Sequence, residues 1–123
     1  MNRKTCNTVL AVVLLLTSGV ASSGVDIALY RKLRASDAKS PTGETLRVYI
    51  SGLQDGLEFS NAFLLAQGKP QVFCSPTKIA FNVENYLQFI DESLTQPRDG
   101  PLKETSPIAI VLVQILQSKL PCS

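Results

Sequence analysis

The stretch Y-I-S-G-L-Q-D-G, residues 49–56, lies in the middle of a long helical pattern that runs from about residue 44 to residue 65. Within this pattern leucine and isoleucine recur at spacings of three, four and seven, which places them on one face of a helix. The predicted buried face consists of Leu46, Ile50, Leu53, Leu57 and Leu64. We expect the rest of the chain to be organised around this central helix.

A second stripe of the same helix carries small side chains. Gly52, Gly56 and Ser60 follow one another at intervals of four residues. Because each glycine inside a helix costs roughly 1 kcal/mol relative to alanine, the stripe indicates a compensating contact. We expect a neighbouring helix to approach closely here, with Tyr49 as a further packing residue. The alternative is direct contact with a partner protein.

Length and charge limit the classes of function. A chain of 123 residues predicts one domain. The net charge is +2, and without Arg3 and Lys4, in a segment that we expect to be removed, ten basic residues balance ten acidic ones. This balance argues against nucleic acid or an anionic membrane as the main partner, since both require a basic surface.

The residue types also argue against catalysis. The sequence contains no histidine, which excludes Ser-His and Cys-His catalysis and the usual zinc sites. Asp91 and Glu92 are adjacent, so on a helix their carboxylates point in different directions. There is no glycine-rich phosphate loop and no metal-ligand spacing. We therefore predict that the protein is not an enzyme and uses no cofactor or metal.

The first 23 residues have the pattern of a signal peptide. A short basic start, residues 1–4, precedes an apolar run at residues 9–16, and a small, polar segment offers cleavage after Ala21 or Ser23. The apolar run is far shorter than the about 20 residues that cross a bilayer. We expect an exported protein with a mature domain of residues 24–123 and no membrane insertion after cleavage. The alternative is a buried N-terminal helix.

Two cysteines remain after removal of Cys6, namely Cys74 and Cys122. In an exported protein two cysteines most simply pair with each other, and the chain-entropy model gives about 4 kcal/mol for a loop of roughly 50 residues. We therefore predict a disulfide between them. The alternative is two free, buried thiols.

Three further helical patterns complete the fold. They cover residues 24–35, with Val25, Leu29 and Leu33 on one face, residues 82–94, and residues 108–120. Ser106 is the predicted N-cap of the last helix, and Pro107 lies in its first turn. This helix is apolar on nearly all sides, so it is buried on several sides or meets another subunit. The prediction is an all-α fold, a compact bundle of about four helices.

Several short motifs carry a resemblance to a known family. In order, they are Y-I-S-G-L-Q-D-G at residues 49–56, F-C-S-P at residues 73–76, an amphipathic helix, and L-P-C at residues 120–122. This combination resembles the Rap/Tai family of immunity proteins, small exported helical proteins associated with type VI secretion in Gram-negative bacteria. The resemblance implies a periplasmic protein that binds an incoming effector, a peptidoglycan amidase, and blocks its active site. It also allows for a homodimer.

Family members often carry two further cysteines, and here those neighbourhoods hold Leu33 with Arg34 and Arg47 with Val48. The retained pair, Cys74 and Cys122, is the pattern that the resemblance implies for a bridge between the two. The departure places this chain among the divergent members of the family.

Two exposed loops are candidates for blocking the effector. One is residues 67–71 with Lys69, and the other is residues 96–104. The second is favoured because it offers charges of both signs to a specific partner. Its candidate binding residues are Arg98, Asp99, Lys103 and Glu104. The alternative is that both loops are ordinary connectors.

A function of a different class is a periplasmic housekeeping protein, such as a stress chaperone or an envelope-complex subunit, with no toxin partner. A stress chaperone would expose an apolar surface on demand, usually by a pH-driven change. Without histidine the usual switch near neutral pH is missing, so only carboxylate titration in strong acid remains.

Overall fold

The computed structural model describes residues 24–96 and 102–123. The signal-peptide prediction, residues 1–23, therefore lies outside the described residues, as do Arg98 and Asp99. The described ranges contain four helices and no strand beyond one isolated β-bridge, which confirms the all-α prediction. The helices are α1 (Ile27–Arg34), α2 (Pro41–Ala66), α3 (Val83–Thr95) and α4 (Ile108–Lys119).

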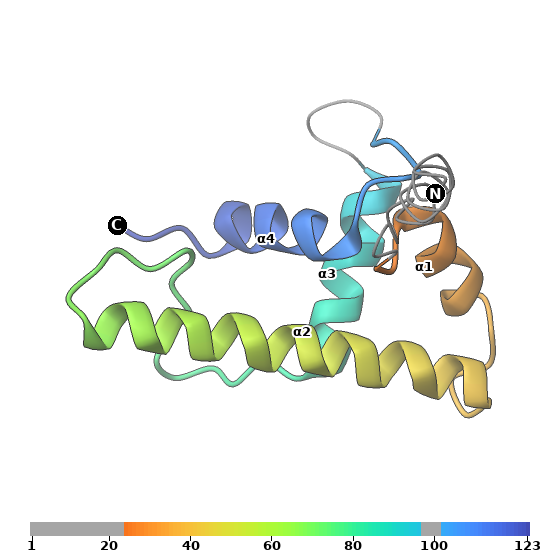
Figure 1. The fold of residues 1–123 in the computed structure, drawn as a ribbon, viewed down its shortest axis with the longest axis horizontal. Helices are drawn as coiled ribbons and strands as arrows, with labels where there is room; N and C mark the ends of the chain where they lie inside the picture. Colours follow the sequence, from red (N-terminus) through yellow and green to blue (C-terminus); the bar gives the residue numbers. More distant parts are fainter. Residues whose placement is uncertain (1–23, 97–101) are drawn as a thin grey trace, which may run out of the picture.

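Helix α2 is the longest element and spans the whole length of the molecule in Figure 1. Its 26 residues correspond to about 39 Å of helix. Helix α1 packs on α2 near the start of α2, and α3 packs on both α2 and α4. Helix α3 thus connects α2 with α4.

One apolar core connects all four helices. The predicted stripes supply most of it, because Leu46 and Ile50 of α2 are buried and Leu53 and Leu57 are half-buried against them. Full burial of a leucine or isoleucine side chain contributes about 1.5–3 kcal/mol. The buried core residues are Ile27, Tyr30, Leu46, Ile50, Phe73, Tyr86, Leu87, Ile90, Ile108, Val111, Leu112, Ile115, Leu116 and Leu120.

Local capping residues define the ends of α2 and the start of α3. The Ser40 hydroxyl accepts a hydrogen bond from the Gly43 amide, and Pro41 fills the first helical position. Asn82 and Asn85 form a reciprocal capping box at the start of α3. Gly68, with φ of 66°, ends α2 in the left-handed conformation that favours glycine.

The predicted starts of α1 and α4 are wrong by one to three residues. Asp26 caps α1, while Ser106 does not cap α4, whose N-cap is Pro107 without a side-chain hydrogen bond. The two segments instead pair as an isolated bridge: the Ile27 amide donates to the Ser106 carbonyl, and the Ile108 amide donates to the Val25 carbonyl. This pairing satisfies amides that a serine cap would otherwise serve.

The buried face of α1 also differs from the prediction. Ile27 and Tyr30 are buried in the core, whereas Leu29 is 41% exposed. Because α1 begins at Ile27, Val25 lies before the helix, although it does pack against the core. Leu33 does pack against the core, as expected.

The predicted approach of a neighbouring helix across Gly52, Gly56 and Ser60 is wrong within the described chain. Apart from its chain neighbours and the adjoining backbone of α2 itself, a Cβ atom at either glycine would meet no described atom within 4 Å. Ser60 is exposed, and its hydroxyl donates to the Gly56 carbonyl at 2.7 Å. The reason is that this stripe points away from α1, α3 and α4. Tyr49, the fourth predicted packing residue, is half-buried against the core.

Candidate functional site

The segment of residues 67–77, which we call the clamped loop, leaves the end of α2 and returns to the body of the molecule. Gly68 donates to the Leu65 carbonyl and Lys69 donates to the Leu64 carbonyl, each at 2.9 Å. These two bonds form a Schellman-type ending that fixes the direction in which the chain leaves the helix. Gly68, Lys69 and Pro70 are exposed and form the tip of the clamped loop.

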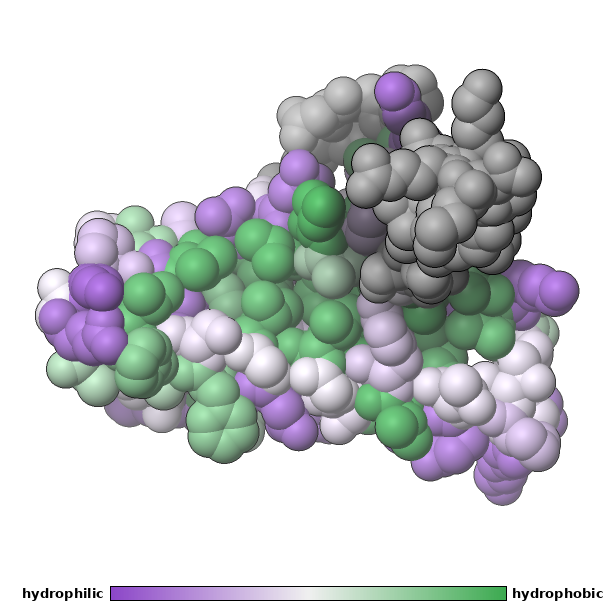
Figure 2. Space-filling view, viewed as in Figure 1, coloured by the Kyte–Doolittle hydropathy of each residue, from purple (hydrophilic) through white to green (hydrophobic). Residues whose placement is uncertain are grey.

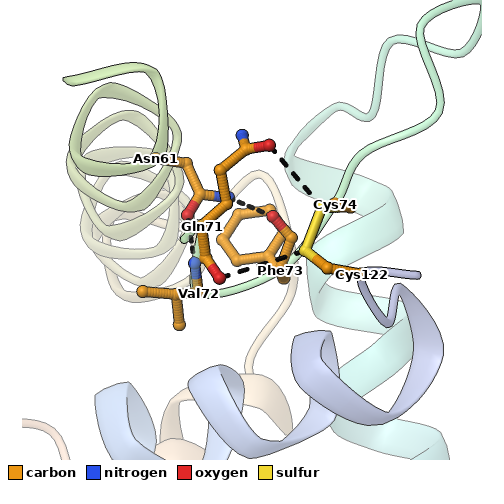
Figure 3. The surroundings of a disulfide bond; sticks show 6 residues. All are labelled: Asn61, Gln71, Val72, Phe73, Cys74 and Cys122. Carbon is orange, nitrogen blue, oxygen red and sulfur yellow. Dashed lines mark hydrogen bonds between the residues drawn. A yellow bond between two sulfur atoms is a disulfide. The ribbon is translucent and has the colours of Figure 1, made fainter. Parts of the chain in front are cut away.

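A buried asparagine of α2 holds the middle of the clamped loop. Asn61 is 5% exposed. Its side-chain amide donates to the Phe73 carbonyl at 2.5 Å, and its side-chain oxygen accepts from the Val72 amide at 2.8 Å (Figure 3). Phe73 is itself 1% exposed. The buried backbone polar groups of this part of the loop are therefore satisfied by a helix side chain.

The predicted disulfide is confirmed and fastens the next residue of the loop. Cys74 and Cys122 are bonded, with their Cα atoms 5.0 Å apart. The Cys74 amide also donates to the Leu120 carbonyl at 2.8 Å, which ties the loop to the end of α4. Gln71 lies against the bridge, its side-chain oxygen 3.6 Å from the Cys74 sulfur (Figure 3). A disulfide sulfur carries no proton, so this approach is a contact and not a hydrogen bond.

The second predicted loop is described only in part. Lys103 and Glu104 are exposed, while Arg98 and Asp99 lie outside the described residues. Glu104 is engaged with α1, because its carbonyl accepts from the Ala28 amide and its carboxylate lies 3.4 Å from the Arg31 guanidinium. Glu104 therefore serves to anchor the chain on α1.

The structure does not bring the two groups of candidate residues together. Lys69 lies just beyond the end of α2, whereas Lys103 and Glu104 lie beside α1, which packs near the start of α2 (Figure 1). The two groups therefore lie toward opposite ends of the molecule (Figure 1). The clamped loop and the second loop are therefore separate candidate surfaces.

Two buried tyrosines connect the helices through carboxylates. The Tyr30 hydroxyl donates to Asp91 at 2.8 Å, and Arg34 pairs with the same carboxylate at 2.9 Å. The Tyr86 hydroxyl donates to Glu58 at 3.0 Å. Burial, reinforced by these carboxylates, raises the pKa of both tyrosines far above its ordinary value. We assign both clusters to the joining of helices.

A small hollow lies where α1, α2 and α3 meet. A hollow between Leu33, Gly43 and Leu87 has a volume of about 10 Å³, which is about the volume of one water-sized probe. Residues 24–96 and 102–123 contain no group of three or more cysteine, aspartate or glutamate side chains arranged for a metal ion. Every helix in these ranges is too short or too polar to cross a membrane.

Asn61 is the residue of this site that the sequence reasoning missed. A signal was present, because Asn61 lies four residues after Leu57 and three before Leu64, on the predicted buried face. A polar side chain at such a position requires a buried hydrogen-bonding partner.

Comparison with family models, with curated proteins and with solved structures gives no match.

Proposed function

We propose that this chain is a periplasmic immunity protein that binds a type VI secreted effector, a peptidoglycan amidase, and blocks its active site with the clamped loop. The observation that supports this most is the way in which the clamped loop is held at both ends. An exposed tip, Gly68–Lys69–Pro70, is held by a helix ending on one side and by Asn61 and the Cys74–Cys122 bridge on the other. Exposed loops on a rigid support are the usual carriers of binding function.

The inhibition mechanism is steric. A loop that is already fixed loses little conformational freedom when it enters a cleft, so more of the contact energy remains for binding. Lys69 gives the tip a positive charge, which suits a cleft rim that carries carboxylates and also speeds the encounter. No bond is made or broken in either protein.

The resemblance and the disulfide both support a location in the periplasm. The motif F-C-S-P contains Cys74 and the motif L-P-C contains Cys122, so the bridge joins two of the segments that carry the Rap/Tai resemblance. Disulfides form and persist in oxidising compartments such as the periplasm. Export through the predicted signal peptide would bring the chain there.

An inhibition assay tests the proposal. The oxidised protein is added to each member of a panel of type VI peptidoglycan amidases, and the release of cleaved peptides from purified cell walls is measured. We expect one amidase to be inhibited at a one-to-one ratio. The double variant Lys69→Glu/Pro70→Gly should weaken this inhibition, whereas Lys39→Glu, an exposed lysine in the turn before α2, should not. If no amidase in the panel is inhibited, or if both variants lose inhibition equally, the proposal is wrong.

A further inference from the structure

Helix α3 is joined to each of the other three helices through one of its own carboxylates. The partner is a cation in each case, and the pairs are Glu84 with Arg47 of α2, Asp91 with Arg34 of α1, and Glu92 with Lys119 of α4. The sequence of α3, V-E-N-Y-L-Q-F-I-D-E-S-L-T, contains these three acidic residues and no basic one. The helix therefore presents a net charge of −3 to cations on three different elements.

Two tyrosine hydroxyls add to the contacts of α3. Tyr30 of α1 donates to Asp91 at 2.8 Å, and Tyr86 of α3 donates to Glu58 of α2 at 3.0 Å. The three α3 carboxylates themselves are not sealed from water, because their side chains are between 37% and 51% exposed. Protons from the solvent therefore reach every ion pair that joins α3 to its neighbours.

The other joints of the fold depend less on charge. Helix α1 is paired with the segment before α4 by backbone hydrogen bonds, to which Arg31 and Glu104 add one ion pair. The clamped loop is held on α2 by the neutral side chain of Asn61 and on the end of α4 by the Cys74–Cys122 bridge. Amides and disulfides carry no group that titrates in acid. Acid therefore acts on the contacts of α3 more than on those of the clamped loop.

Acid removes the charges of α3 and leaves those of its partners in place. Carboxylates generally lose their charge below about pH 4, whereas lysine and arginine stay protonated. Hydrogen bonds from Lys119 and Gln88 hold the pKa of Glu92 below its ordinary value, so this contact stabilises the fold at neutral pH and is lost as the pH falls through the lowered pKa. Residues 24–123 contain ten basic and ten acidic residues, so full protonation also leaves a net charge of +10, which favours expansion.

We propose that α3 is an acid-released helix, which leaves the other three helices in acid while the Cys74–Cys122 bridge keeps the ends of α2 and α4 together. The bridge joins positions 48 apart, and α3 lies between them in the sequence. The released helix therefore stays tethered and returns when the pH rises. Apolar side chains already lie at the surface between α4 and α2 in Figure 2. Removal of Leu87 and Ile90 from the core enlarges this apolar surface.

Hydrogen exchange followed by mass spectrometry tests the proposal on the oxidised protein. Protection factors are measured in steps from pH 7 to about pH 2.5, each corrected for the intrinsic exchange rate at that pH. We expect residues 83–95 to lose protection by roughly tenfold or more at a pH where residues 57–74 lose less than about threefold. Loss of protection in all helices at the same pH, earlier loss in α1 or α2, or full protection of α3 down to about pH 2.5 overturns the proposal.

A charge variant separates the α3 carboxylates from the general effects of acid. Glu84→Gln/Asp91→Asn/Glu92→Gln removes the three charges of α3, so its α3 peptides should exchange roughly tenfold faster than those of the parent at pH 7. The matched control removes the same number of charges from exposed residues outside α3, in the variant Asp37→Asn/Glu44→Gln/Asp55→Asn. Equal exchange of α3 in the two variants, or parental exchange in the first, overturns the role of the α3 carboxylates.

Reduction tests the part of the disulfide. At the pH where α3 opens in the oxidised protein, the reduced protein should lose protection in residues 57–74 as well as in α3. The reason is that the ends of α2 and α4 lose their covalent link at the same time as the helix that packs on both. The same exchange pattern in the oxidised and reduced proteins overturns the proposal that the bridge is the tether.

Discussion

The side chain of Asn61 donates a hydrogen bond of 2.5 Å to the carbonyl oxygen of Phe73, and both residues are almost fully buried. The same side chain accepts from the neighbouring Val72 amide. One residue of α2 thus fixes the backbone of a loop that returns to the helix 11 and 12 positions later. The candidate binding loop owes its shape to this contact and to the adjacent disulfide.

Replacing Asn61 by leucine should destabilise the protein by about 2–4 kcal/mol. Leucine has a similar size, but it leaves the buried Phe73 carbonyl and the partly buried Val72 amide without partners, at about 1–3 kcal/mol for the carbonyl and less for the amide. Urea unfolding measures the change. Ser60→Ala, one residue away and exposed, is the control and should stay within about 0.5 kcal/mol. An Asn61→Leu variant as stable as its parent would show that the hydrogen bonds of Asn61 do not hold the loop.

Removing the disulfide should lower stability by about 4 kcal/mol, because its cysteines are 48 positions apart and the bridge restricts the unfolded chain accordingly. The variant Cys74→Ser/Cys122→Ser and the reduced parent should therefore unfold at nearly the same denaturant concentration. Unequal midpoints would mean that the serines perturb the fold by themselves. A midpoint unchanged by both treatments would contradict the stabilising role of the bridge.

Two glycines of α2 should respond to alanine with opposite signs. At Gly43 a Cβ atom would overlap the Asp37 carbonyl oxygen and lie 2.9 Å from the Ala38 Cα, so Gly43→Ala should destabilise the fold. At Gly52 a Cβ atom would meet nothing within 4 Å beyond the adjoining part of its own helix, so Gly52→Ala should stabilise the fold by about 1 kcal/mol. Thermal unfolding of both variants checks the two signs. Destabilisation by Gly52→Ala would reveal a contact within the monomer at that face.

Alkaline pH should unfold the protein through its buried tyrosines. The folded state raises the pKa of Tyr30 and Tyr86, so above about pH 10 the unfolded chain releases protons that the folded chain retains. Stability is thus fully present below pH 10 and declines as the pH rises beyond it. The melting temperature measured between pH 8 and pH 11.5 should fall, and it should fall less steeply in Tyr86→Phe. Equal slopes in the variant and the parent would contradict this assignment.

The helices could be predicted from the sequence because their signals are local. The disulfide could be predicted because few cysteines are available to pair. The spacing of the leucines defines the bodies of the helices. Residues close by in the sequence define their ends, namely Ser40 with Pro41, Asn82 and Gly68. Residues 24–123 hold only two cysteines, so their pairing has a single solution. The pairing of Asp26 with Pro107 could not be predicted, since nothing local in either segment indicates a partner 81 positions away.

The candidate site was harder to predict because periodicity groups residues by face but does not say what each face meets. Gly52, Gly56 and Ser60 were correctly placed on one stripe, yet the stripe points away from the other described helices. The clamped loop was recognised from Gly68, Pro70 and Cys74. The part that Asn61 plays in holding this loop was not recognised, because the sequence does not place the loop backbone beside Asn61.

The most direct test of the immunity proposal is photo-crosslinking from position 69. A benzoylphenylalanine replaces Lys69 in the exported chain, and cells that receive type VI effectors are irradiated. The account predicts one dominant cross-linked product, a cell-wall amidase joined one-to-one, and no such product from a probe at Lys103. A spread of unrelated unfolded proteins, or the same amidase captured equally from position 103, would contradict the claim that the clamped loop is the inhibitory element.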